Sequence, residues 1–325
     1  LKKVFIKFCR LIGFEIIDQS NFSSPTLNKN LNETLSVPGE KSITIPLGQI
    51  NIKNKINSLK IILRSCTSEL IMDQNKKRIF DNEKNEYSFR TLRSLIKSIH
   101  AASKKFKNIK FEIIVTDTNS PKKDIDQIKK ILEESNLQNQ FISINLEKFK
   151  NKVKDGYSNA KFSNMANFYN SLMIAKNEEA DIIYFVEDDY IHADNALEEM
   201  IFAYEKFNTI FSKDLVLLPS DYPYLYSKDE NTKIYLGEKH HWRLVSESLV
   251  TFMTSKKLIE KYYDNLEKMG IEWNDPWEEP LHKIYKTTPC LSPVPSLAIH
   301  CANINSIFGI SPLVDAKKLW ENNED

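Results

Sequence analysis

The sequence predicts an α/β fold, in which a doubly wound, mostly parallel sheet carries helices on both faces. Between residues 59 and 187, short apolar runs rich in β-branched residues alternate with segments whose apolar residues recur at helical spacing. The chain has 325 residues, which is enough for one large domain and a short extension. We therefore expect an N-terminal extension over residues 1–57 and one main domain over residues 58–325.

The extension is predicted to begin with a basic amphipathic helix. Residues 1–17 place their lysine and arginine side chains on one side and their aromatic and aliphatic side chains on the other. Such a helix could lie on an anionic membrane surface or pack on the main domain. Polar residues from about 18 to 59 then indicate a linker with a short strand at residues 42–47.

The main domain is expected to alternate strands and helices. Strands are predicted at residues 59–64, 111–115, 141–144 and 181–186, and helices at residues 87–106, 124–135 and 162–175. Further on, helices are predicted at residues 193–207, 256–269 and 277–287, strands at 215–218 and 296–300, and antiparallel strands at 233–236 and 242–253. In such a sheet, ligands bind beyond the carboxyl ends of the strands.

The composition disfavours several classes of function. A formal net charge of +1 provides no field that would attract nucleic acid, so we expect no nucleic-acid partner. Only 7 glycines are present, and neither of the glycine-rich loops that bind dinucleotides or phosphates is found. The four cysteines are far apart, which predicts free thiols in a reducing compartment. No apolar run reaches the roughly 18 residues that span a bilayer. We expect a cytoplasmic location, with peripheral contact at the inner face of the plasma membrane as an option.

Three consecutive carboxylates, Glu187, Asp188 and Asp189, directly follow the apolar strand at residues 181–186. Crowded like charges raise one another's pKa values, so a positive group is needed among them. Because strand side chains alternate, Glu187 and Asp189 should point to one side. Such oxygen ligands suit Mn²⁺ or Mg²⁺, which bind one or two carboxylates together with substrate phosphates. The alternative is an acidic loop that caps the next helix, although Asp194 already stands at that position.

This acidic cluster resembles the D-x-D element of GT-A glycosyltransferases, in a variant written Glu-Asp-Asp. Other stretches look like the start of family 2-like transferases or like a class of bacterial cell-envelope glycosyltransferases: Leu63-Arg64-Ser65, Arg90–Ile99, Val115–Ser120, Pro219–Tyr226 and His241-Trp242-Arg243. The resemblance covers residues 59–300. It implies a GT-A domain with a Rossmann-like sheet, a nucleotide-diphosphate sugar as donor, and a role in polysaccharide biosynthesis.

The resemblance also implies roles for individual residues. Asp117 would hold the nucleobase or ribose, Asp188 the ribose or sugar, and Asp189 the metal that bridges the diphosphate. Further donor contacts are expected from Arg64, Asn119, Lys161, Asn164, Glu187 and, as a phosphate-binding fork, Arg243.

His300 ends the predicted strand at residues 296–300. GT-A enzymes often take a further metal ligand from a C-terminal histidine after such a strand, and a neutral imidazole suits Mn²⁺. The resemblance therefore implies that His300 is the second metal ligand. The alternative is a half-buried histidine that is hydrogen-bonded to the backbone.

An inverting transferase needs a carboxylate that accepts the proton of the acceptor hydroxyl. The resemblance places an acidic pair at a helix start, here Glu278-Glu279, with Asp275 as the expected N-cap. Glu278 is the expected base and Glu279 the second choice, although the helix dipole alone would favour acidic residues there. Asp221, which also follows a strand, is a rival base.

The expected function is transfer of a sugar, with inversion, from a nucleotide-diphosphate sugar to a glycan or lipid-linked acceptor. Trp242 could stack on a sugar, as could the tyrosines at positions 222, 224 and 226, although a core-facing strand explains the tyrosines equally well. One alternative is a nucleotidyltransferase that makes the sugar nucleotide, which the absence of glycine from residues 63–70 disfavours. The other is a catalytically silent carbohydrate-binding domain with the same fold.

Overall fold

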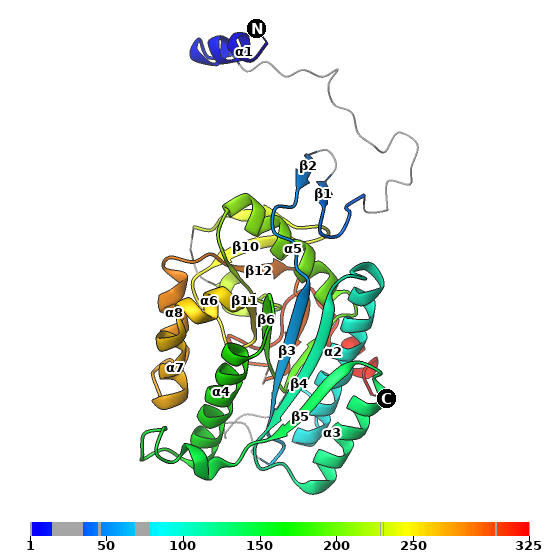
Figure 1. Ribbon diagram of the computed structural model, residues 1–325, viewed down its shortest axis with the longest axis vertical. Coiled ribbons are helices and arrows are strands. Elements are labelled where there is room, and N and C mark those ends of the chain that lie inside the picture. The colour runs from blue at the N-terminus through cyan, green and yellow to red at the C-terminus, as the bar shows by residue number, and fades with distance from the viewer. Residues whose placement is uncertain are drawn as a thin grey trace.

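A nine-stranded sheet forms the centre of the protein in the computed structural model, which describes residues 2–14, 35–44, 47–68, 78–227, 229, 231–302 and 304–324 (Figure 1). Its strands lie in the order β5 (Gln138–Ser143), β4 (Lys110–Asp117), β3 (Ser58–Ser65), β6 (Ile182–Glu187), β11 (Phe252–Ser255), β8 (Val216–Leu217), β12 (Cys290–Val294), β10 (His241–Val245) and β9 (Ile234–Leu236). The first four strands are parallel, as are β8 and β12, whereas β11 and β10 run antiparallel to their neighbours. The predicted α/β sheet is confirmed, and its parallel part is the segment in which strands and helices alternate.

Helices cover both faces of this sheet. Successive side chains along a strand point to opposite faces, so an apolar strand has apolar side chains to bury on both. Along β3, Leu59, Ile61 and Leu63 enter one core and Ile62 enters the other. The first core is shared with α2 (Lys84–Lys105), α3 (Lys122–Glu134) and α5 (Ala196–Phe211). The second is shared with α4 (Asn159–Asn177), α6 (Lys256–Lys261), α7 (Tyr263–Ile271) and α8 (Glu279–Tyr285). The fold is therefore doubly wound, as predicted.

Short elements bring the C-terminal part of the chain to the end of β6. β7 (Tyr190–His192) pairs with β13 (Ala298–His300), and the register places His300 opposite Tyr190. The last helix, α9 (Ala316–Glu321), contacts β7. Two 3-10 turns, η2 (Leu146–Phe149) and η3 (Pro223–Tyr226), complete the domain.

The N-terminal extension contains a hairpin and a separate helix. β1 (Lys41–Thr44) and β2 (Gly48–Asn51) form the hairpin, which accounts for part of the strand predicted at residues 42–47. The carboxylate of Glu205 in α5 accepts hydrogen bonds from the backbone N–H groups of Ile56 (2.9 Å) and Gly39 (3.1 Å). The predicted basic helix is α1 (Lys2–Leu11), which lies away from the sheet in Figure 1. Most of the predicted linker falls outside the described residues.

The predicted strand at residues 242–253 is instead two strands, β10 and β11, which occupy different places in the sheet. The chain leaves the sheet between them because residues 246–251 turn toward the acidic cluster. There, the hydroxyl of Thr251 accepts a hydrogen bond from the backbone N–H of Glu187 at 3.0 Å. The predicted helix at residues 256–269 is likewise divided, at Tyr262, into α6 and α7.

Two predicted helix caps are wrong. α5 begins at Ala196 with Asn195 at the N-cap, so Asp194 does not cap it. α8 begins at Glu279 with Glu278 at the N-cap, so Asp275 lies outside the helix. No helix in the described part of the chain is long and apolar enough to cross a membrane.

The contact between α7 and α4 leads to a stability prediction. A Cβ atom at Gly270 would lie 2.7 Å from Cβ and 3.0 Å from Cα of Tyr169. Replacing glycine by alanine in a helix usually stabilises it by about 1 kcal/mol, whereas overpacking a core costs about 1–3 kcal/mol. We expect Gly270→Ala to lower the free energy of unfolding by about 1 kcal/mol or more, as measured by urea denaturation. Lys268→Ala, at an exposed position of α7, should leave the free energy of unfolding nearly unchanged. Equal stability of the two variants would contradict the close packing of Gly270 against Tyr169.

Candidate active site

The carboxyl ends of β3, β4 and β6 meet at one edge of the sheet and carry the predicted site residues. The strand register places Arg64 beside Glu187 and Ser65 beside Asp117. This edge is where ligands bind in parallel α/β sheets, because loops and helix ends leave side chains exposed there.

Arg64 supplies the positive charge that Glu187 requires. Its guanidinium lies 3.0 Å from the carboxylate of Glu187 and donates a 2.8 Å hydrogen bond to the side-chain oxygen of Asn164. It also lies over the rings of Phe168 (5.5 Å) and Trp277 (5.6 Å). Burial raises the pKa of Glu187, and the charge of Arg64 opposes that shift. The predicted donor contacts Arg64, Asn164 and Glu187 therefore lie together.

Asp188 points away from its two neighbours, toward α2. Its carboxylate forms an ion pair with Lys84 and accepts hydrogen bonds from the Ser88 hydroxyl (2.7 Å) and the Cys66 backbone N–H (3.1 Å). The alternation expected for a strand end is therefore present. Three partners on one carboxylate make Asp188 a fixed part of the site wall.

Asp189 faces His300, as the prediction of a shared metal requires. Nε2 of His300 lies 3.5 Å from Oδ1 of Asp189, while Nδ1 hydrogen-bonds the backbone carbonyl of Phe308 at 2.6 Å. The imidazole also stacks on Tyr190, with ring centroids 4.7 Å apart. A carbonyl that accepts from Nδ1 leaves Nε2 free to bind a cation.

The electrostatics of the pair favour a negative Asp189. Burial works against its charge, but His300, Lys84 and Arg78 together hold the pKa of Asp189 well below its usual range. Burial likewise works against the charge of His300, but Asp189 raises the pKa of this imidazole. One carboxylate and one imidazole suit Mn²⁺, which accepts oxygen and nitrogen ligands. Among the described residues there is no group of three or more His, Cys, Asp or Glu that could hold a metal. The other ligands would therefore be water and phosphate oxygens.

Glu278 and Glu279 differ sharply in their surroundings. Burial raises the pKa of Glu278 to about 7, and the charge of Glu187 adds to the shift while Arg64 and His300 oppose it. Glu278 is thus within electrostatic range of the acidic cluster. Glu279 instead pairs with Lys283 at 2.7 Å on the outer side of α8. Glu278, the preferred candidate, is thus the member of the pair whose charge interacts with Glu187, Arg64 and His300.

The remaining predicted donor contacts on these elements are Asp117, Asn119 and Lys161. Its carboxylate accepts hydrogen bonds from the Ser120 hydroxyl (2.5 Å) and backbone N–H (3.3 Å), and burial raises its pKa. Asn119 is exposed and has a positive φ of 60°. Lys161, at the start of α4, lies 4.3 Å over the ring of Trp273.

Asp221 and Arg243 form an ion pair with each other. Asp221 is fully buried, forms an ion pair with Arg243, and accepts a hydrogen bond from the Tyr226 hydroxyl. These bonds leave Asp221 poorly placed to accept a proton from a substrate.

Two of the aromatic residues that were predicted to stack on a sugar are buried. Trp242 is fully buried in the core, so it cannot stack on a sugar. Tyr222 is also buried, and its hydroxyl bonds that of Tyr190 at 2.6 Å.

Two cations of the site, Arg78 and Lys84, were not predicted from the sequence. Arg78 lies 3.7 Å from Oδ2 of Asp189, and Lys84 pairs with Asp188. Both precede or begin α2, far along the chain from the acidic cluster. The only sequence signal was electrostatic, namely that three adjacent carboxylates need positive partners.

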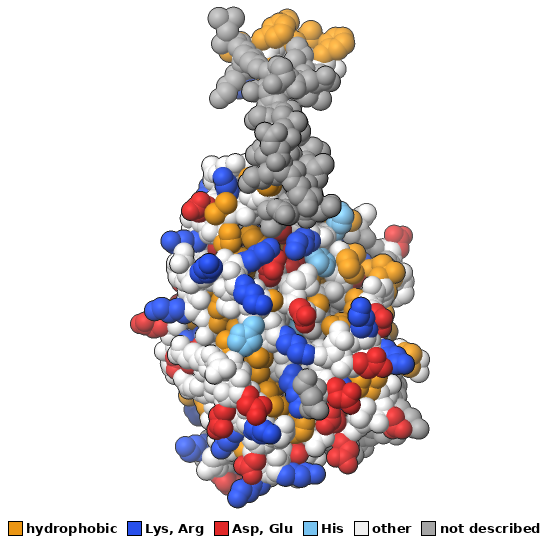
Figure 2. All heavy atoms as spheres, turned by 90° about the vertical axis from the view of Figure 1, so that its right-hand side faces the viewer, with side chains coloured by type: hydrophobic (Ala, Val, Ile, Leu, Met, Phe, Trp, Pro, Cys, Tyr) orange, Lys and Arg blue, Asp and Glu red, His pale blue; other side chains and the backbone are white. Residues whose placement is uncertain are grey.

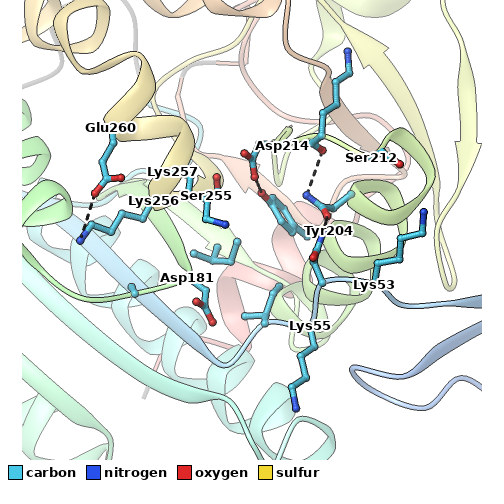
Figure 3. A pocket seen from close by; sticks show the side chains of 16 residues that line it. Lys53, Lys55, Asp181, Tyr204, Ser212, Asp214, Ser255, Lys256, Lys257 and Glu260 are labelled. Carbon is cyan, nitrogen blue, oxygen red and sulfur yellow. Dashed lines mark hydrogen bonds and ion pairs between the residues drawn. The ribbon is translucent and has the colours of Figure 1, made fainter.

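A hollow of about 680 Å³ lies at the amino ends of β3 and β6, away from the acidic cluster (Figure 3). Several lysines surround it, but Lys53 and Lys55 extend away from its centre. Asp181 in its wall accepts hydrogen bonds from the backbone N–H groups of Asn57 (2.7 Å) and Ser58 (3.2 Å). The hollow lacks converging reactive groups, so we place no reaction there.

No protein-family model matches the sequence, and no curated protein is detectably similar to it. Solved structures do match. The crystal structure of S. aureus TarS 1–349 has 13% sequence identity and a TM-score of 0.42, and the match covers 72% of this chain and 57% of TarS 1–349. The galactosyltransferase LgtC, in complex with donor and acceptor sugar analogs, has 9% identity and a TM-score of 0.37, over 82% and 95%. A UDP-glucose pyrophosphorylase complexed with UDP-glucose has 6% identity and a TM-score of 0.41, over 83% and 97%. Glycosyltransferases are thus among the similar structures.

Proposed function

We propose that the chain is a divalent-metal-dependent glycosyltransferase that moves a sugar from a nucleotide-diphosphate sugar to a glycan or lipid-linked acceptor of the cell envelope, with inversion. The proposal is supported by Asp189 facing His300 just after β6, and by the raised pKa of Glu278, on which the charges of Glu187, Arg64 and His300 act. A metal pair and a carboxyl group with a raised pKa are what such a reaction needs at one site.

The residues divide the chemical work as follows. Asp189 and His300 would hold Mn²⁺ or Mg²⁺, which supplies a positive charge for the leaving diphosphate. Arg78, beside Asp189, and Lys84, beside Asp188, add positive charge to the acidic cluster. The Glu278 carboxylate accepts the proton of the acceptor hydroxyl, which then attacks the sugar carbon as the bond to the diphosphate breaks. Asp117, Arg64 and Asn164 orient the donor.

The proposal is tested by donor turnover. Purified protein is incubated with a panel of nucleotide sugars in Mn²⁺, in Mg²⁺ and in a chelator, and the release of nucleoside diphosphate is measured. We expect release from one class of donor, which depends on the metal. Release of pyrophosphate from a nucleoside triphosphate and a sugar phosphate would indicate a nucleotidyltransferase instead. Glycan binding without nucleotide or metal binding would indicate a silent binding domain.

The proposal includes contact with an anionic membrane through α1. Phe5 and Phe8 are each 58% exposed and Leu11 is 84% exposed, and the helix contains basic but no acidic residues. In Figure 2, the apolar side chains of α1 stand clear of the domain, whose visible face mixes charges of both signs. An apolar face flanked by basic residues is typical of helices that lie on anionic membranes.

Vesicle flotation tests this contact. We expect the chain to float with vesicles that contain phosphatidylglycerol and less with pure phosphatidylcholine. Phe5→Ser with Phe8→Ser should weaken binding at least about tenfold, because each phenylalanine loses apolar burial. Lys7→Gln should weaken it about fivefold, on anionic vesicles only. The control is Ile234→Ser, which removes an exposed apolar side chain from β9. Equal flotation of all four proteins would contradict membrane contact through α1.

A further inference from the structure

Arg78 is a half-buried cation with a buried N–H group that lacks a hydrogen-bond partner among the described residues. Its guanidinium lies 4.5 Å over the ring of Tyr87 and 3.7 Å from Oδ2 of Asp189. Within the described part of the chain, its buried NH1 group has no hydrogen-bond partner. A separation of 3.7 Å is too long for a hydrogen bond. An anionic oxygen placed next to this group would therefore find a donor that the described residues leave unpaired.

The neighbourhood favours an anion at this point. Arg78 and Lys84 both face the acidic cluster, and a metal on Asp189 and His300 would add further positive charge. Arg64, Arg78 and Lys84 balance the three carboxylates of the cluster, so a bound divalent metal would leave an excess of positive charge that an anionic group can offset. A guanidinium suits phosphate oxygens, because its N–H groups bind two oxygens at once.

The segment that carries Arg78 is held by the C-terminal helix. Trp320 of α9 stacks on Phe80, with ring centroids 4.3 Å apart, and packs against Tyr87 at 4.6 Å. The Tyr87 hydroxyl donates to the carbonyl of Phe80 (2.5 Å) and accepts from its N–H (3.1 Å). Arg90 then fixes Trp320, because it lies 4.4 Å over the indole and donates to the backbone carbonyl of Trp320 at 2.7 Å.

Two short paths therefore join Trp320 to Arg78. One passes through the ring of Tyr87, which touches both residues. The other passes through Phe80, two positions along the chain from Arg78. We infer that Arg78 binds the diphosphate of the donor and that Trp320 of the C-terminal helix is a positioning residue, which acts by holding Arg78 over the site. This inference rests on the proposed function, since it assumes a donor with a diphosphate group.

The test measures binding of inorganic pyrophosphate in the presence of Mg²⁺ by calorimetry, with no turnover required. Arg78→Ala should weaken binding at least about tenfold, because it removes a charge-assisted hydrogen bond. Trp320→Leu should weaken binding about threefold, as expected for partial loss of such a bond, and Trp320→Phe, which keeps a stacking ring, should be closer to wild type. In the Arg78→Ala background, Trp320→Leu should have no further effect, because its influence passes through Arg78.

Phe106→Leu is the matched control, because Phe106 is a buried core aromatic that packs on Phe202 away from the acidic cluster. It should bind pyrophosphate like wild type. If Trp320→Leu does not fold, Phe80→Leu provides the same comparison. Wild-type affinity in Arg78→Ala, or an undiminished effect of Trp320→Leu in the double variant, would overturn the inference. If those results occur in a protein that still turns over a nucleotide sugar, the proposed function stands. If wild type neither binds pyrophosphate nor turns over any donor, both fail.

Discussion

Asp189→Ala should lower metal-dependent donor turnover at least about a hundredfold, the size of effect seen when one group that stabilises developing charge is removed. Asp189 lies opposite Nε2 of His300 at 3.5 Å, so the substitution leaves the imidazole without its carboxylate partner. The measurement is the initial rate of nucleoside diphosphate release as a function of Mn²⁺ concentration. The response to the metal should disappear together with the rate.

Asp194→Ala is the control for this substitution, since Asp194 is an exposed aspartate five positions along the chain, after β7. It should retain wild-type turnover and metal dependence. Circular dichroism and thermal melting of both variants separate loss of the site from loss of the fold. Undiminished, metal-dependent turnover in Asp189→Ala would remove this residue from the metal site.

Glu278→Gln should lower kcat about 10²–10⁴-fold, the usual contribution of a general base, with little change in donor affinity. Glutamine fills the same space at the start of α8 but cannot accept a proton. Glu279→Gln should be close to wild type, because the Glu279 side chain pairs with Lys283 at 2.7 Å. If kcat fell in Glu279→Gln and not in Glu278→Gln, Glu279 would be the base instead.

The pH dependence gives a second readout for Glu278. Burial raises the pKa of this carboxyl to about 7, and the ionised form is the one that accepts a proton. The value of kcat/KM should therefore rise as the pH increases through about 7 and level off above it. In Glu278→Gln the remaining activity should lose this rise. A wild-type profile that is flat across neutral pH would show that another group acts as the base.

The sequence was most informative where local pattern decides structure. The short apolar runs at β3 and β6 predicted buried strands, and the residue pairs Arg64–Glu187 and Ser65–Asp117 follow from the register of parallel strands. The acidic cluster was visible because a strand end with three carboxylates is unusual. Its alternation, with Asp188 turned away from the other two, also follows from strand geometry.

The sequence was least informative where contacts join distant segments. Nothing local indicated that Arg78 or Lys84 would reach the acidic cluster, or that Trp320 would stack on Phe80. Apolar periodicity did not reveal that Trp242 is fully buried, since one aromatic residue in a short strand fits either a core or a binding surface. The predicted caps at Asp194 and Asp275 failed because the chain places its helix starts a few residues later.

Whether Asp189 and His300 bind a divalent cation together with a nucleoside diphosphate can be tested most directly by a thermal-shift screen. Nucleotide sugars are screened with and without Mn²⁺, on wild type and on Asp189→Ala. A ligand that binds the native state at a hundred times its Kd adds about 2.7 kcal/mol of stability. We predict that one class of nucleotide sugar raises the Tm of wild type only when Mn²⁺ is present, and that Asp189→Ala shows no rise. A rise that is independent of Mn²⁺ and equal in both proteins, or no rise with any donor, would contradict the account.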